Sequence, residues 1–405
     1  MNIRRSAALV AATAVIGMAT APAALADASA PSPSPSVAIP SGLYGKTDPT
    51  YDGVWRQSLS LLAQHTTGVK PAAKAVDWLT GQQCANGGFA AFRADTGKAC
   101  DAKTPLDSNS TGAAVQALAA LGGHDAEVGK AVKWLESVRG DDGGWGYNPG
   151  GASDANSTSV VIGALAAAGE KVTSAQDALV KLSIPCGKDG GGAFAYQPDK
   201  KGKLAANADA TAAGVLGGLG KGLAADGAKQ AGTPSCKGSG TPDAAQAAQN
   251  GSAYLTEALA KDHHLMSSMP GAKDQPDYGN TADAVTALSA AGHGDQAAPA
   301  LSWLEKNATR WAAQSGPAAY AQLVLASHAA GADPRDFGGT DLVKALNATG
   351  PAPSSTKTAA DRKKDEKKDE KKDDGGISVW YVVAVAAVAG IGIGFLFSGR
   401  KKQQL

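Results

Sequence analysis

The sequence predicts an all-α fold, an α/α toroid of about six outer and inner helix pairs, with one C-terminal transmembrane helix. Alanine and glycine dominate the composition, and runs of β-branched residues are scarce. Apolar, helix-length segments recur at a period of about 50 residues, and a long apolar run lies near the C-terminus. The net charge of +1 argues against nucleic acid as a partner, because binding phosphates requires a basic surface.

Residues 1–26 have the pattern of a secretory signal peptide. Arg4 and Arg5 precede a short apolar run, and Ala24-Leu25-Ala26 supplies the small residues of a cleavage site. A permanent N-terminal anchor is the alternative, but the apolar run is short and Pro22 interrupts it. Residues 27–42 contain alternating Pro and Ser and are predicted to form an extended spacer.

Residues 377–398 are predicted to be a single transmembrane helix. This segment is apolar and long enough to cross a hydrocarbon core of about 30 Å. The basic segment 399–405 follows it, and basic flanks stay in the cytoplasm. Residues 350–376 carry mixed charge without an apolar face, which is typical of a disordered tether. We therefore expect a single-pass cell-membrane protein whose globular part, 43–349, lies outside the cell.

Four cysteines follow the predicted signal peptide, and an even number in an exported chain favours disulfide bonds. Three pairings are possible. Cys84–Cys100 and Cys186–Cys236 are favoured because each bond would close one loop within one repeat. A zinc site would need closely spaced thiolates or nearby histidines, so no metal site is predicted.

A repeated segment predicts an outer layer of helices. Residues 74–79, Lys-Ala-Val-Asp-Trp-Leu, are echoed by residues 130–135, and weaker copies occur at 253–255 and 301–304. Each copy opens a segment with apolar residues at helical spacing. Charged residues accompany the Trp and Leu, so one face of each helix is expected to remain in water.

A second repeated segment predicts an inner layer. Polar helix starts lead into small apolar residues and end at glycine, so both helix boundaries are indicated. These starts lie at 107–111, 154–158, 207–211 and 277–281, with a degenerate last copy at 320–331 and a degenerate first pair around 55–62. Helices that are apolar on every side are buried. An open solenoid is the alternative, but no polar capping repeat is present, which favours a closed ring.

The joins between the two layers resemble the glutamine–tryptophan repeat of squalene and oxidosqualene cyclases. The first match comprises Lys74, Ala75, Trp78, Leu79, Gln83, Gly87 and Phe89. The second comprises Lys130, Ala131, Trp134, Leu135, Gly143 and Trp145, with Arg139 in place of the glutamine. The chain thus resembles the superfamily of terpenoid cyclases and protein prenyltransferases, whose members are α/α toroids. The resemblance covers most of 43–349.

The catalytic motifs of that superfamily are missing. The cyclases use a D-x-D-D acid, whereas segment 207–211 has a single carboxylate, and the D-x-C zinc pair of the prenyltransferases is absent. No catalytic residue is therefore assigned, and the chain is expected to be non-catalytic. An enzyme similar to a terpenoid cyclase or to a polysaccharide lyase remains an alternative. A lyase would need a base in the cleft, and the only support for one is His124, which lies close after a predicted inner helix.

Proteins that only bind share the toroid, among them cobalamin carriers of the intrinsic-factor type. This resemblance in fold implies a small-molecule ligand, with cobalamin or another corrinoid as a candidate and a neighbouring membrane transporter as a candidate partner. A structural or protein-interaction module of the cell envelope is the remaining alternative.

The turns before the inner helices form the predicted binding site. If the inner helices run parallel, their turns and free N–H groups gather at one mouth of the ring. The candidate residues are Phe89, Phe92, Asp107, Asn109, Trp145, Tyr147, Asp154, Asn156, Phe194, Tyr196, Asp209 and Tyr278. Helix caps and turn packing require the same residue types, and their repetition favours that structural interpretation.

Overall fold

The computed structural model describes residues 38–267 and 273–356. These ranges contain α-helices and only four short strands, which confirms the all-α prediction. The predicted signal peptide 1–26, transmembrane helix 377–398 and tail 399–405 lie outside the described residues, as does most of the spacer and the tether. Within the two described ranges, no helix combines the length and the hydropathy that a membrane span requires.

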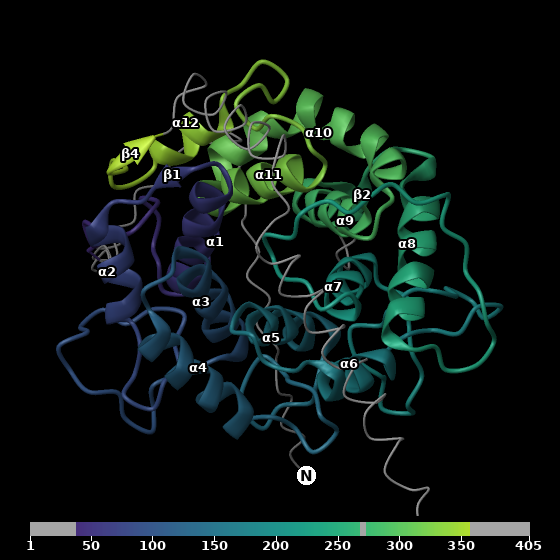
Figure 1. Cartoon of the computed structure of the whole chain (residues 1–405), viewed down its shortest axis with the longest axis horizontal. Helices are drawn as coiled ribbons and strands as arrows, with labels where there is room; N and C mark the ends of the chain where they lie inside the picture. The colour runs from purple at the N-terminus through teal and green to yellow at the C-terminus, as the bar shows by residue number, and fades with distance from the viewer. Residues whose placement is uncertain (1–37, 268–272, 357–405) are drawn as a thin grey trace, which may run out of the picture. The chain divides into compact units, whose positions relative to one another are not determined.

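Six inner helices form a closed ring of contacts (Figure 1). Each of these helices packs on the next one in the series, and the last packs on the first. They are rich in alanine, and most of their side chains are buried, as the uniformly apolar segments predict. The helices are α1 (Gly53–Thr66), α3 (Ser108–Leu121), α5 (Ala155–Ala167), α7 (Ala208–Gly218), α9 (Tyr278–Ala290) and α11 (Pro317–Ala329).

Six further helices pack on the outside of this ring. Their charged residues stay exposed, while Trp and Leu side chains such as Trp134 and Leu135 face the inner helices and are buried. These outer helices are α2 (Ala73–Gly81), α4 (Asp125–Ser137), α6 (Thr173–Val180), α8 (Ala244–Ala260), α10 (Gly294–Ser315) and α12 (Leu342–Asn347).

The two ends of the described chain meet where the ring closes. Helix α12 packs on both α11 and α1 and so connects the last inner helix with the first. Strand β1 (Val69–Lys70) pairs with β4 (Ser355–Thr356) in antiparallel register beside them. The segment around 55–62 was expected to be a degenerate helix pair. In the structure it lies within a single inner helix, α1.

Two turns between outer and inner helices contain equivalent side-chain hydrogen bonds. The Gln83 amide donates a hydrogen bond to the carbonyl oxygen of Gly87 at 3.0 Å, and Arg139 Nε donates to that of Gly143 at 2.8 Å. Arginine thus makes the bond that glutamine makes in the other turn. Gly87 has φ +99°, and a Cβ there would lie 2.1 Å from the Lys130 carbonyl oxygen, so only glycine fits.

Four inner helices begin with the same pair of hydrogen-bonding side chains. A cap residue accepts from the backbone N–H three residues later, as predicted. A threonine four residues after the cap accepts from a backbone N–H of the preceding turn and so joins turn and helix. The cap and threonine pairs are Asp107 and Thr111, Asp154 and Thr158, Asn207 and Thr211, and Asp277 and Thr281.

Both favoured disulfide bonds are present. Cys84 pairs with Cys100, and Cys186 pairs with Cys236. The second bond connects the loops on either side of α7. A hairpin of β2 (Leu265–Ser267) and β3 (Gln275–Asp277) leads into α9. Paired cysteines are consistent with an exported domain, because disulfides persist in oxidising compartments.

Candidate functional site

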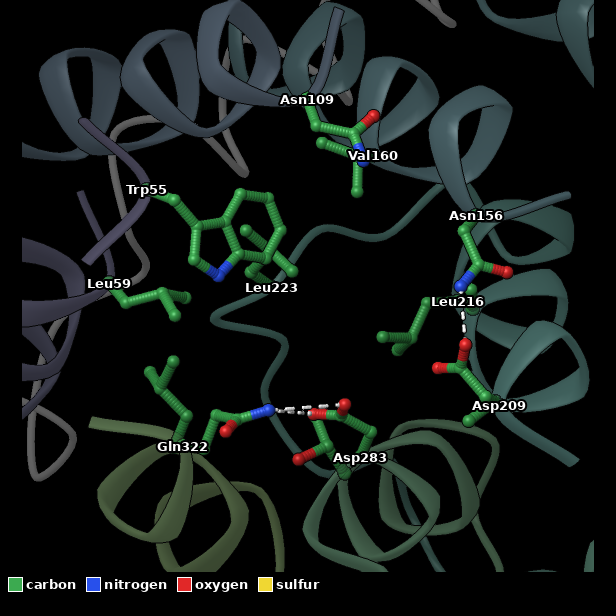
Figure 2. A pocket seen from close by; sticks show the side chains of 14 residues that line it. Trp55, Leu59, Asn109, Asn156, Val160, Asp209, Leu216, Leu223, Asp283 and Gln322 are labelled. Carbon is green, nitrogen blue, oxygen red and sulfur yellow. Dashed lines mark hydrogen bonds between the residues drawn. The ribbon is translucent and has the colours of Figure 1, made fainter. Parts of the chain in front are cut away.

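A cavity of about 170 Å³ lies at the centre of the helical ring (Figure 2). All six inner helices contribute side chains to its wall. Most of the wall is aliphatic, with leucine, valine and alanine side chains and the indole of Trp55. The polar groups that line it are Asn109, Asn156, Asp209, Asp283, Thr286 and Gln322.

Three of the polar groups occupy equivalent positions. Asn109, Asn156 and Asp209 each lie two residues after the cap of their helix, on α3, α5 and α7. The cap fixes the first turn, and the residue two positions later then faces the centre of the ring. Asn156 Nδ2 donates to Asp209 Oδ2 at 2.6 Å, which joins neighbouring helices across the wall.

Asp283 lies six residues after the cap of α9, one turn deeper than the repeated positions. The equivalent residues on α3, α5 and α7 are Ala113, Val160 and Ala213, all small or aliphatic. Gln322 of α11 donates through Nε2 to both carboxylate oxygens of Asp283, at 3.3 and 3.2 Å. Asp283 therefore departs from the repeat. Gln322 on the adjacent inner helix provides the hydrogen-bond donor for its carboxylate.

The two cavity carboxyls have altered acidities. Burial raises the pKa of Asp283 to about 7, and the charges of Asp209 and Asp277 raise it further, against the opposing hydrogen bond from Gln322. Burial also raises the pKa of Asp209, although its bond from Asn156 opposes this. No Lys, Arg or His is among the described side chains that line the cavity. The pair therefore has no cationic partner within the cavity wall.

Several other polar groups of the wall lack hydrogen-bond partners among the described residues. The amide oxygens of Asn109 and Asn156 are fully buried and accept no hydrogen bond. The indole nitrogen of Trp55 faces the cavity (Figure 2), and no residue of the described ranges accepts from it. Because buried polar groups are nearly always paired, such groups in a cavity point to a ligand or to bound water.

The predicted site residues fall into separate environments. Asn109, Asn156 and Asp209 line the cavity. Asp107 and Asp154 are buried helix caps. The turn aromatics Phe89, Trp145 and Phe194 are buried in the core and lie outside the cavity wall.

The remaining predicted aromatics lie on the edge of the ring or outside it. Tyr147 and Tyr196 are 43% and 44% exposed, and their backbone carbonyls accept from the first residues of α3 and α5. Phe92 stacks on Trp78, with ring centroids 6.4 Å apart. Tyr278 stacks with Trp303 and Trp311, at 5.1 and 5.6 Å, and does not line the cavity.

The exposed tyrosines lie next to capping carboxyls. Burial raises the pKa of Asp107 to about 6. Burial and the neighbouring Asp107 charge raise the pKa of Tyr147 to about 12. Burial likewise raises the pKa of Tyr196, and the adjacent Asp154 raises it further. This arrangement recurs from one repeat to the next, which supports the structural interpretation of these residues.

Trp55, Asp283 and Gln322 were not predicted as site residues. An alignment of the inner helices on their caps identifies Asp283 as unusual, because it is a carboxylate where the other copies have alanine or valine. Trp55 and Gln322 lie on helices without a capping side chain, so no repeat signal marks them. In the described part of the chain, no group of three His, Cys, Asp or Glu residues is placed to hold a metal ion.

Comparison with known proteins does not identify a family. No protein-family model matches the chain, and no curated protein matches it. Among solved structures, a crystal structure of a protein from Actinoplanes is similar, with a TM-score of 0.47 and 15% sequence identity. The similarity covers 73% of this chain and 95% of that one. At this level of similarity, nothing is inferred from that protein about function.

Proposed function

We propose that this chain is a cell-surface module that captures a small molecule in the cavity at the centre of the helical ring. The observation that carries the proposal is the cavity itself, to which every inner helix contributes. Its apolar wall contains a few converging polar groups, some of them without partners, which is the usual composition of a small-molecule site.

We also propose a location and a fold family for the chain. The two disulfides support export, and export is what the signal peptide expected at 1–26 would achieve. A span at 377–398 would hold the ring at the outer face of the membrane, where a neighbouring transporter would receive the ligand. The ring of paired helices supports placing the chain with the α/α toroids of the terpenoid cyclase and prenyltransferase superfamily.

The size of the cavity limits the ligand. Drug-sized molecules occupy pockets of about 300 to 1,000 Å³, whereas this cavity measures about 170 Å³. A corrinoid such as cobalamin is larger still and would have to lie outside the ring. The size therefore favours a compact metabolite as the ligand.

A thermal-shift screen of the purified full-length chain against compact metabolites tests this proposal, because a ligand that binds only the folded state raises the melting temperature. Ala213→Leu would fill part of the cavity and should abolish any shift. Ala126→Leu, on the exposed start of α4, is the matched control and should respond like the unaltered chain. Shifts that persist equally in both variants, or no shift with any compound, would overturn the proposal.

One observation favours an enzyme as the second candidate. The Asp283 carboxyl, with a pKa of about 7, keeps its proton on about half of the molecules at neutral pH, in a largely apolar cavity. Such a group has the acidity of a general acid. An enzyme of this kind would convert a small isoprenoid, and Asp283→Asn would abolish turnover. Product analysis by mass spectrometry tests this, and unchanged substrate with the unaltered chain would reject it.

A further inference from the structure

The charge of the central cavity limits what it can bind. Asp209 and Asp283 line the same space, from neighbouring helices α7 and α9, and the charge of Asp209 raises the cost of ionising Asp283. No described cationic side chain faces them there. An anionic ligand would add a third negative group to a buried space, whereas a cation would supply the missing counter-charge.

The opposite wall suits a cation as well. Helices α1 and α7 lie three steps apart in either direction around the ring, so Trp55 on α1 faces the side that carries Asp209. Figure 2 shows the indole across the cavity from Asp209 and Asp283. Indole is the aromatic ring that attracts cations most strongly, and the leucines between these groups would contact methyl or methylene groups.

The Asp283 carboxylate is not explained by the needs of the fold. Three other inner helices pack in the same ring with alanine or valine at the position of Asp283. A second observation points to a ligand independently of the carboxylates. The side chain of Asn109 has a fully buried oxygen without a donor and makes no hydrogen bond to any described residue, although it lines the cavity.

From these observations we infer that the ligand is a compact organic cation, an amine or quaternary ammonium compound, held between the Asp209 and Asp283 carboxylates and the indole of Trp55. This inference rests on the proposed function and specifies its ligand class. The ammonium group lies at the carboxylate side of the cavity, and the apolar part of the ligand contacts the aliphatic wall.

The inference fixes the direction of a pH effect. The charged groups that act on the Asp283 carboxyl are Asp209 of α7 and Asp277 at the start of α9. Helix α11 presents the uncharged Gln322, and neither α8 nor α10 contributes a side chain to the cavity wall. Cation binding favours the ionised carboxylate, so affinity should rise between pH 6 and pH 8, through the pKa of about 7. A neutral acceptor ligand would show the opposite trend.

Titration calorimetry with the full-length chain tests the inference, with choline and tetramethylammonium as cationic probes. The neutral compound 3,3-dimethyl-1-butanol has the shape of choline without its charge and is the matched probe. We expect both cations to bind at pH 8 at least about tenfold more tightly than the neutral compound, a difference of about 1.4 kcal/mol. Binding should weaken at pH 6.

Variants distinguish residues that bind the cation from residues that only cap a helix. Asp283→Asn and Asp209→Asn should each weaken cation binding at least about tenfold, whereas Asp243→Asn, at the exposed cap of α8, should leave it unchanged. If the neutral compound binds as tightly as choline, or affinity falls as pH rises, the cation inference is overturned while the capture function stands. If neither probe binds and the metabolite screen is also negative, both are overturned.

Discussion

Helices α5 and α9 begin alike and then differ. Both start with a capping aspartate, Asp154 or Asp277, and both have a threonine four residues later that bonds to the preceding turn. Two and six residues after the cap, however, α5 carries Asn156 and Val160, whereas α9 carries Gly279 and Asp283. The shared residues hold the helix in the ring, whereas Asn156, Val160 and Asp283 line the central cavity.

This difference shows how a repeated fold acquires a single site. The caps and threonines recur on four inner helices, where they join the helix to the turn before it. The position six residues after the cap carries no such requirement, and it changes from alanine or valine on three helices to Asp283 on α9. Chemistry is therefore to be sought where the repeat is broken, and stability where it is kept.

The largest expected loss of stability is that of Trp145→Ala, which we compare with Trp55→Ala. Trp145 is buried in a repeated turn and donates from its indole to the Leu135 carbonyl oxygen at 2.7 Å. Trp145→Ala should reduce the free energy of unfolding by roughly 3 to 5 kcal/mol. Trp55→Ala removes a cavity wall and should lower stability less while abolishing ligand binding. Urea unfolding of both variants checks this, and equal losses would contradict the separation.

Asp283→Asn should stabilise the chain at pH 8. The pKa of about 7 lies above that of an unfolded aspartate, so the folded chain keeps a proton that the unfolded chain releases. Stability from this group is therefore present below about pH 4 and is lost as pH rises to about 7. The variant should gain roughly 4 kcal/mol at pH 8. Unfolding curves at pH 5 and pH 8 measure this, and a loss of stability would refute it.

Asp107→Asn should show a smaller gain of the same sign. Its pKa of about 6 is also raised by burial, and asparagine caps a helix as well as aspartate does. The expected gain at pH 8 is roughly 3 kcal/mol, because the shift is smaller than that of Asp283. Ligand affinity should not change, since Asp107 does not line the cavity. A larger gain than that of Asp283→Asn would reverse the ranking.

The smallest expected effect is the loss of stability on replacing one of the repeated threonines. Thr211→Val keeps the shape of the side chain but leaves the backbone N–H of Phe194 without its acceptor, at a cost of about 1 to 3 kcal/mol. Thr286 is the control, because it lines the cavity and its hydroxyl bonds only to the carbonyl of its own helix, at Ala282. Thr286→Val should change the midpoint of thermal unfolding little. Equal shifts for both would argue against a special role of the repeated threonine.

Local chemistry accounts for what the sequence predicts well. The caps at Asp107 and Asp154, the two disulfides and the layering of helices depend on residues close together in the chain or on the repeat itself. The repeat places Asn109, Asn156 and Asp209 beside the caps, and all three line the central cavity.

The rest of the site depends on closure of the ring. Trp55 reaches the side opposite Asp209 only because α12 and the pairing of β1 with β4 bring the two ends of the chain together. Asp283 lies inside an apolar helix, where a lone carboxylate gives no periodic signal. The turn aromatics Phe89, Trp145 and Phe194 also recur at regular spacing, but they are buried in the core and lie outside the cavity wall.

A crystal structure of the chain grown with tetramethylammonium tests most directly the claim that departures from the repeat form the site. The account predicts the cation in the central cavity, in contact with the Asp283 carboxylate and the face of Trp55. A cation bound instead at the repeated edge of the ring, beside Tyr147 or Tyr196, with the central cavity holding only water, would contradict it.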